Sequence, residues 1–226
     1  MKDLKQFSAI VEDQVKKWSG LKQGQRPVWP VISLSRDYGT GGGAIAKAVA
    51  ERLHFAFWDQ ELVQAIAENT GIGKNLLRSL DEHSRSTIED LISGVLLGRG
   101  GTEVEYVSQL YRIIHTIEKH GSGVIVGRGA QFVLKNESSL KVKIVADFPR
   151  RVSWVMQREK LDQKEAEKKV RKIDKDRSDF HLRYYYKDAN NPVYYDLIVN
   201  TEGLHHDNAV NIIVQAFKEK FGTIPS

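Results

Sequence analysis

The chain has no cysteine among its 226 residues and no long apolar run. The absence of cysteine excludes disulfides and thiolate metal sites, and it is compatible with a reducing compartment. No apolar segment approaches the ~18 residues that a membrane-spanning helix requires. The N-terminal segment MKDLKQFSAIVEDQVKKW is charged and lacks the apolar stretch of a signal peptide, so we expect a cytoplasmic protein without a membrane partner.

A strong excess of one charge is also missing. The net charge is +5, from 34 basic and 29 acidic residues. This mild excess suits an anionic substrate such as a nucleotide, but it is too diffuse to indicate a nucleic-acid-binding protein. The seven histidines are scattered without the companions of a metal site, so we predict no metal site built from side chains alone.

Short apolar runs alternate with helical patterns along the chain. Strands are predicted in VWPVISLS, FAFWD, GVIVGRGA, LKVKIVADF and YYDLIVNT. An amphipathic helix and a linker are predicted over 1–27, and residues 60–120 show a mostly helical pattern interrupted at NTGIGKN and LGRGGTE. The alternation predicts a three-layer α/β/α fold with a parallel sheet, in which ligands bind at the carboxyl ends of the strands.

A glycine-rich segment, SRDYGTGGGAIA, stands between the first strand and a helix. Such a turn lets backbone N–H groups and a helix N-terminus converge on phosphate. Against the pattern G-x-x-x-x-G-K-[ST], however, Gly42 takes the place of the lysine, Gly43 that of the hydroxyl and Arg36 that of the first glycine. Arg36 or Lys47 could restore the charge, although Lys47 is more simply a solvated helix lysine. The alternative is a tight turn without a ligand.

Together these segments resemble the cytidylate kinase-like family, a divergent branch of the P-loop nucleoside monophosphate kinases. The resemblance covers Val31 to about Phe217, and it is carried by ISLSRDYGTGGGAIAKAVAERLHFAFWDQELV, VIVGRGAQFVL, EKKVRKIDKDRSDFHLRYY and YYDLIVNT. It implies a P-loop NTPase fold over 28–226, with a helical acceptor-binding insertion at 60–120 and a helical lid at 162–190. It also implies phosphoryl transfer from ATP, with Mg²⁺, to a nucleoside monophosphate such as CMP or dCMP.

The resemblance assigns site residues as well. It implies that the loop binding ATP comprises Arg36, Asp37, Tyr38, Gly39, Thr40, Gly41, Gly42 and Gly43. Arg128, between glycines at a strand end, resembles the arginine that grips the acceptor phosphate, a task that suits a planar guanidinium. Asp59 is either an acceptor contact or an N-cap for the next helix. Gln109 and Arg112 are further predicted acceptor contacts.

The charged segment before residue 190 resembles a lid that carries arginines onto the transferring phosphoryl group. Its candidates are Arg171, Asp174, Arg177 and Arg183, chiefly Arg177. The alternative for Asp174 is a surface ion pair with Arg177, which is three residues away.

The chain departs from the family pattern at two places. Gly43 and Ala44 replace an Arg-Glu pair in the loop, and Val126 and Gly129 stand where cytidylate kinases carry acids. Asp37 and Asp147 are candidate substitutes for a metal-organising carboxylate. The departures leave open a nucleotide-binding sensor without turnover, or a kinase for another small metabolite. We predict a monomer or a homodimer.

Overall fold

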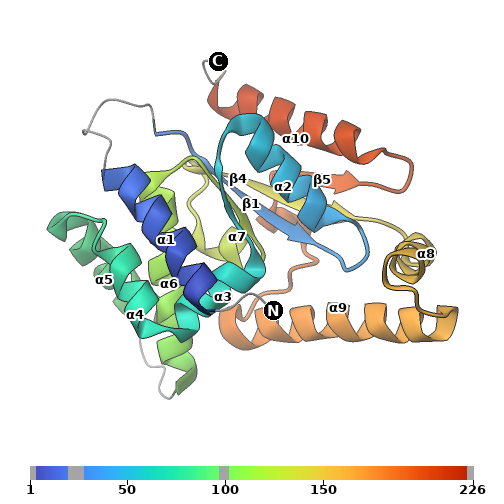
Figure 1. Ribbon diagram of the computed structural model, residues 1–226, viewed down its shortest axis with the longest axis horizontal. Helices are drawn as coiled ribbons and strands as arrows, with labels where there is room; N and C mark the ends of the chain where they lie inside the picture. Colours follow the sequence, from blue (N-terminus) through green and yellow to red (C-terminus); the bar gives the residue numbers. More distant parts are fainter. Residues whose placement is uncertain (1–3, 20–27, 97–101, 223–226) are drawn as a thin grey trace.

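The computed structural model describes residues 4–19, 28–96 and 102–222. A five-stranded parallel sheet lies at its centre, in the order β2-β3-β1-β4-β5 (Figure 1). Its strands are β1 (Val31–Arg36), β2 (Ala56–Trp58), β3 (Gly123–Val126), β4 (Ser139–Val145) and β5 (Leu197–Asn200). The five strand predictions from the sequence are confirmed, because each apolar run overlaps one of these strands, and no strand extends more than one residue beyond its run.

Helices cover both faces of the sheet, which confirms the predicted three-layer fold. Helices α2 (Gly42–Leu53) and α10 (His206–Phe221) pack together on one face. The opposite face carries α3 (Gln60–Glu68), α6 (Thr102–His120) and the short α7 (Ala130–Val133). Strand β1 is apolar on both sides, so Ile32 and Leu34 join one hydrophobic cluster while Val31 joins the other.

The helical region on the second face also holds α1 (Leu4–Ser19), α4 (Thr70–Leu77) and α5 (Glu82–Leu96). Helix α1 packs on α3 and α4, with Phe7 and Val11 buried between them. The ring of Trp18, near the end of α1, stacks on His120 with centroids 3.8 Å apart. The predicted amphipathic helix therefore exists, whereas its linker, residues 20–27, lies outside the described residues.

The predicted interruption at NTGIGKN exists, but it is confined to Asn69, between the end of α3 and the start of α4. NTGIGKN is helical from Thr70 onward, because the Asn69 side chain caps α4 by accepting from the backbone N–H groups of Gly71 and Ile72, each at 3.1 Å. Such a cap and the burial of apolar side chains offset the poor helix propensity of the two glycines. Most of LGRGGTE, the second predicted interruption, lies outside the described residues.

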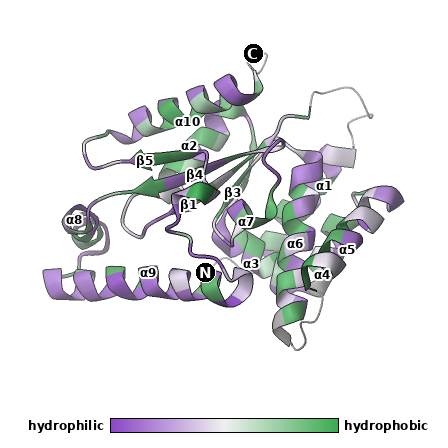
Figure 2. Cartoon of the chain, turned by 180° about the vertical axis from the view of Figure 1, so that it is seen from behind, coloured by the Kyte–Doolittle hydropathy of each residue, from purple (hydrophilic) through white to green (hydrophobic). Residues whose placement is uncertain are grey.

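Two helices extend from the carboxyl end of the sheet beyond β4. Helix α8 (Phe148–Glu159) packs on the long α9 (Gln163–Tyr185) through Val152, Val155, Ala166 and Val170. A capping box between Asp162 and Glu165 starts α9. Hydrophilic residues cover most of α9 (Figure 2). A 3₁₀ turn at Pro192–Tyr194 then leads into β5. In the described part of the chain, no helix combines the length and apolarity needed to cross a membrane.

Candidate active site

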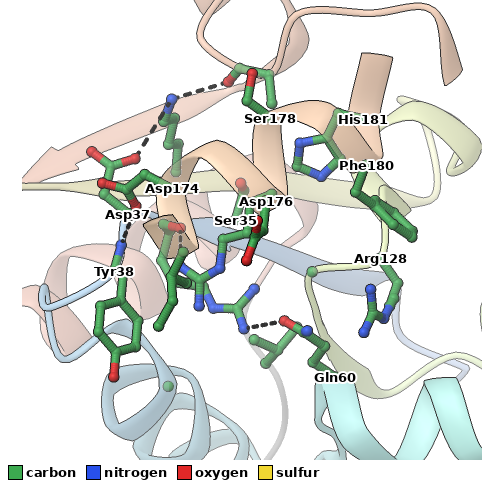
Figure 3. Close-up of a pocket in the computed structure, with 18 of the residues that line it drawn as sticks. Ser35, Asp37, Tyr38, Gln60, Arg128, Asp174, Asp176, Ser178, Phe180 and His181 are labelled. Atoms are coloured by element: carbon green, nitrogen blue, oxygen red, sulfur yellow. Dashed lines mark hydrogen bonds and ion pairs between the residues drawn. The ribbon is translucent and has the colours of Figure 1, made fainter. Parts of the chain in front are cut away.

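A cavity of about 840 Å³ opens at the carboxyl ends of β1, β3 and β4, below α9 (Figure 3). Its polar lining includes Arg36, Asp37, Asp59, Gln60, Arg128, Lys143, Arg151, Asp174, Arg177 and His181. In Figure 3, Asp37 and Asp174 lie together beside Tyr38, whereas Arg128 lies apart from them, on the side of Gln60 and Phe180. The cavity therefore has two ends of different character.

The arginine end consists of Arg36, Arg128 and Arg177. Each of these guanidinium groups donates to a neutral oxygen. Arg36 donates to the side-chain oxygen of Gln60 at 2.8 Å, and Arg128 donates to that of Gln64. Arg177 donates to the backbone oxygen of Arg36 at 2.9 Å, which brings the lid candidate onto the glycine loop. These contacts orient three cations through neutral oxygens, and only part of their charge is balanced by nearby carboxylates, Asp59 at Arg36 and Asp174 and Asp37 at Arg177.

Burial and neighbouring cations together disfavour the charged form of Arg36. Burial first, then repulsion from Arg177 and from Arg128, lowers the pKa of Arg36 to about 9, while Asp59 opposes the shift. Arginine stays protonated at neutral pH even so. The lowered pKa means that the cationic form is disfavoured here, so an anion bound between the arginines would remove a repulsion that already exists.

Arg128 is held by an unusual backbone. Its φ angle is 53°, in the left-handed region that few side chains adopt, and its glycine neighbours Gly127 and Gly129 have φ angles of 74° and 72°. The Tyr185 hydroxyl fixes this turn by donating to the Arg128 backbone oxygen at 2.6 Å. A Cβ at Gly129 would lie 2.1 Å from the Tyr185 ring, so only glycine fits. The Arg128 guanidinium lies 4.8 Å from the Phe180 ring centroid. A strained, over-determined arginine at a strand end is typical of a functional site.

The packing of the glycine loop explains why a lysine is absent from it. Gly41 is the N-cap of α2, with a φ angle of 72°. A Cβ at Gly42 would lie 2.7 Å from the Arg36 Cβ, so the Arg36 side chain fills the space that a lysine there would need. At Gly43, by contrast, a Cβ would meet nothing within 4 Å. Thr40 closes the turn by donating its hydroxyl to the Asp37 backbone oxygen at 2.9 Å.

The loop end of the cavity consists of Asp37, Tyr38, Lys143, Arg151 and Asp174. The Asp174 carboxylate accepts the backbone N–H of Tyr38 at 2.9 Å and also pairs with the Arg151 guanidinium. Arg151 in turn donates to the Tyr38 backbone oxygen at 3.1 Å. Asp174 is therefore more than a surface partner of Arg177: it ties α9 to the loop, and its charge also favours the protonated form of Arg177.

A carboxylate for a metal ion is present at the loop end. Burial raises the pKa of Asp37, although Lys143 and Arg151 oppose the shift. The described residues contain no group of three or more acids or histidines that could hold an ion. Mg²⁺ with a nucleotide does not need such a group, since one or two carboxylates and the phosphates suffice. Asp37 fits this role. Asp147 does not, because it lies outside the cavity at the start of α8.

Asp59 is the predicted N-cap of α3, and its place at the cavity leaves the predicted acceptor contact a prediction. Its carboxylate caps α3 by accepting from the Leu62 backbone N–H at 2.8 Å, and the residue also lines the cavity.

Gly39 and Thr40 line a second cavity of about 530 Å³ on the other side of the loop, with Trp154 and Leu204. The glycine loop therefore separates two cavities.

Other predicted residues are not brought to the cavity. Arg112 makes two hydrogen bonds of 2.7 Å to Glu89, on the surface between α5 and α6, and Gln109 on the same helix does not line the cavity. Arg183 is exposed and lies over the Tyr184 ring. Arg171 lies over Phe148, and Lys47 is exposed beside Glu51.

Sequence reasoning missed Gln60, Gln64, Lys143, Arg151 and His181. The glutamines form a pair four residues apart on α3, a spacing that puts both on one helix face. Lys143 alternates with apolar residues in its strand, a pattern that more often places a lysine in solvent. Arg151 and His181 carried no local signal, because their partners are distant in the sequence.

Comparison with known proteins agrees with this geometry. The family model of the cytidylate kinase-like family matches residues 31–203. A cytidylate kinase of Methanothrix thermoacetophila is 25% identical over 83% of this chain and 98% of its own length. That of Archaeoglobus fulgidus is 27% identical over 84% and 95%. The solved structure of an uncharacterized protein from Eubacterium ventriosum shares the fold, with a TM-score of 0.67, 22% identity and coverage of 84% and 98%. The chain belongs to the cytidylate kinase-like family, a P-loop kinase family, and this kinase homology supports a phosphotransferase.

Proposed function

We propose that the protein transfers a phosphoryl group from ATP to a nucleoside monophosphate, with CMP or dCMP as the acceptor. The observation that carries this proposal is the arginine end of the cavity, where three guanidinium groups lie together and each donates a hydrogen bond to a neutral oxygen. The choice of cytidine rests on the family and on the names of its relatives. We further predict that the chain acts in the cytoplasm, as a monomer or a homodimer.

The two cavities suggest a division of roles. We place the donor's phosphates on the glycine loop, where the α2 N-terminus favours anions. The cavity beside Trp154 and Leu204 would take the donor's base and ribose. Arg36 and Arg128 would hold the acceptor phosphate, and Arg177 would reach the group in transfer between the two. An Mg²⁺ ion held by Asp37 would supply charge neutralisation at the donor phosphates.

The reaction asks little covalent chemistry of the protein. An oxygen of the acceptor phosphate forms a bond to the γ-phosphorus as the bond to the ADP oxygen breaks. Catalysis then consists of alignment and of stabilising charge that spreads over the transferring group. Asp174 contributes by holding α9, and with it Arg177, against the loop.

A phosphoryl-transfer screen tests the proposal. The purified chain is incubated with ATP, Mg²⁺ and each nucleoside or deoxynucleoside monophosphate, and the product nucleotides are separated directly. We expect CDP or dCDP from the wild-type chain. Arg128→Ala should abolish its formation, and Arg112→Ala, a charge loss on the surface pair with Glu89, should leave it unchanged.

The other outcomes are equally informative. Turnover of a different monophosphate would keep the reaction and replace the acceptor. Binding of ATP without turnover of any acceptor would contradict the proposal and favour a sensor, for which the closed Gly42 position would be the structural reason.

A further inference from the structure

Lys143 is a buried cation that the roles above leave unused. It lies in β4, in register with Ser35 of β1, and its side chain is only 8% exposed. Lysine is almost never buried to this extent without a reason, because the desolvation of an ammonium group is costly. The residue lines the main cavity at its loop end.

The contacts of Lys143 hold its ammonium group without using all of it. Its Nζ donates to the Ala189 backbone oxygen at 3.0 Å and to the Asn190 side-chain oxygen at 2.8 Å. An ammonium group has three N–H donors. The remaining donor has Asp37 at 4.0 Å, beyond hydrogen-bond distance. A phosphate oxygen entering at the loop end could therefore accept from Lys143 while Ala189 and Asn190 keep the amine in place.

The glycine loop lacks a cation at this end. Gly42 is closed to any side chain, and the first turn of α2 carries no basic residue. Lys47 points to solvent, where it approaches Glu51 at 3.8 Å. Arg36 is directed to Gln60, at the arginine end of the cavity. Within the described residues that line the cavity, Lys143 and Arg151 are the basic residues at the loop end, and Arg151 is paired with Asp174.

We propose that Lys143 supplies from β4 the phosphate-binding cation that the glycine loop lacks, and that its Nζ contacts the β- and γ-phosphate oxygens of the donor. The inference rests on the proposed function, which names ATP as the phosphoryl donor. It assigns the residue that lets a glycine loop without a lysine bind the phosphates of that donor. In the usual pattern the lysine stands at the start of the helix that follows the loop. In this chain the cation would instead come from the neighbouring strand β4 and approach the same phosphates from another side.

The absence of cysteine allows a specific test. Lys143→Cys introduces a single thiol. Its thiolate displaces bromide from 2-bromoethylamine, which forms a C–S bond and restores an amine of lysine's length. Alkylation with iodoacetamide gives a neutral side chain as the matched control. Lys143→Met removes the charge at nearly constant volume, and Lys141→Met removes a charge two residues away, outside the cavity.

Two readouts separate a phosphate contact from a structural role. The first is kcat/KM for ATP, which we expect Lys143→Met to lower by about 10²-fold. The second is calorimetric binding of ATP and of AMP. Loss of a contact to the β- and γ-phosphates should weaken ATP by about tenfold and leave AMP unchanged. Aminoethylation of the cysteine variant should restore both values, and the neutral adduct should restore neither.

Three results would overturn the inference. They are activity of Lys143→Met within threefold of wild type, equal weakening of ATP and AMP, or rescue by the neutral adduct. If the methionine variant fails to fold, the two adducts of the cysteine variant give the comparison. If the wild-type chain turns over no acceptor, the proposed function fails, but the ratio of ATP to AMP affinity still decides whether Lys143 contacts the phosphates.

Discussion

The two ends of the main cavity hold their cations in opposite ways. At the loop end, Arg151 is paired with Asp174, and Lys143 has Asp37 nearby. At the arginine end, the guanidiniums of Arg36 and Arg128 donate to amide oxygens. A carboxylate partner neutralises a cation, whereas an amide orients it and leaves its charge available. Carboxylates therefore balance much of the positive charge at the loop end, whereas the charge at the arginine end is left more available to an anion.

The largest expected effect is at the arginine end. Arg36→Met should lower kcat/KM for the acceptor by about 10²–10³-fold, because a preorganised charge is lost from a buried site. The free energy of unfolding should not fall, since the repulsion from Arg177 and Arg128 disappears with the charge. Steady-state kinetics and urea denaturation measure the two quantities. Lys47→Met, a charge loss on the exposed face of α2, is the control and should change neither.

A pH effect should follow from His181, which faces the same cations. Burial, followed by repulsion from the cations Arg36, Arg177, Lys143 and Arg128, lowers the pKa of His181 to about 4. Since the unfolded state takes up the proton first, stability is complete above pH ~6.5 and is lost as the pH falls toward 4. The loss amounts to about 3 kcal/mol when fully expressed.

Urea denaturation between pH 4 and pH 7 measures this loss. His181→Phe, which suits a position beside Phe132 and Phe180, should reduce the slope of the profile. The remaining slope is expected from His120, because burial lowers the pKa of His120 to about 4 as well. An unchanged slope in the variant would show that other groups cause the acid sensitivity.

A smaller effect is expected at the loop end. Asp174→Asn keeps an acceptor for the Tyr38 backbone N–H but removes the partner of Arg151, whose side chain is only 11% exposed. An unpaired, largely buried guanidinium should cost about 2 kcal/mol of stability. Asp179→Asn, on the same helix in an exposed pair with Lys175, is the control. Equal denaturation midpoints for the two variants would contradict the assigned difference between the ends.

The smallest expected effect uses inorganic phosphate as a probe. Phosphate at ten times its Kd should stabilise the protein by about 1.4 kcal/mol, which raises Tm by a few degrees. Arg128→Ala should remove this shift, while Lys143→Met should reduce it little, because a single phosphate is expected at the arginine end. Differential scanning fluorimetry at constant ionic strength measures both. A shift lost equally in the two variants would mean that the ends do not act separately.

The fold was predictable because its signals are local. Apolar runs of strand length between helical patterns indicated a parallel sheet, and the sheet has the predicted strands. Asp59, Arg128 and Arg177 could be placed from strand ends and motif spacing, and they line one cavity. Arg112 was misplaced because the turn of a helix, which decides whether a side chain meets Glu89 or the cavity, depends on packing that spacing alone does not specify.

The order of strand, glycine loop and helix, the arginine between two glycines and the lack of a lysine in the loop are all readable from the amino-acid sequence. What lies around the glycine loop follows from the tertiary structure. The Arg36 side chain fills the space beside Gly42, and Lys143, which we propose as the replacement cation, comes from a strand about a hundred residues later, beside Ser35. No local pattern encodes such a contact, because parallel strands that are neighbours in the sheet need not be neighbours in the chain.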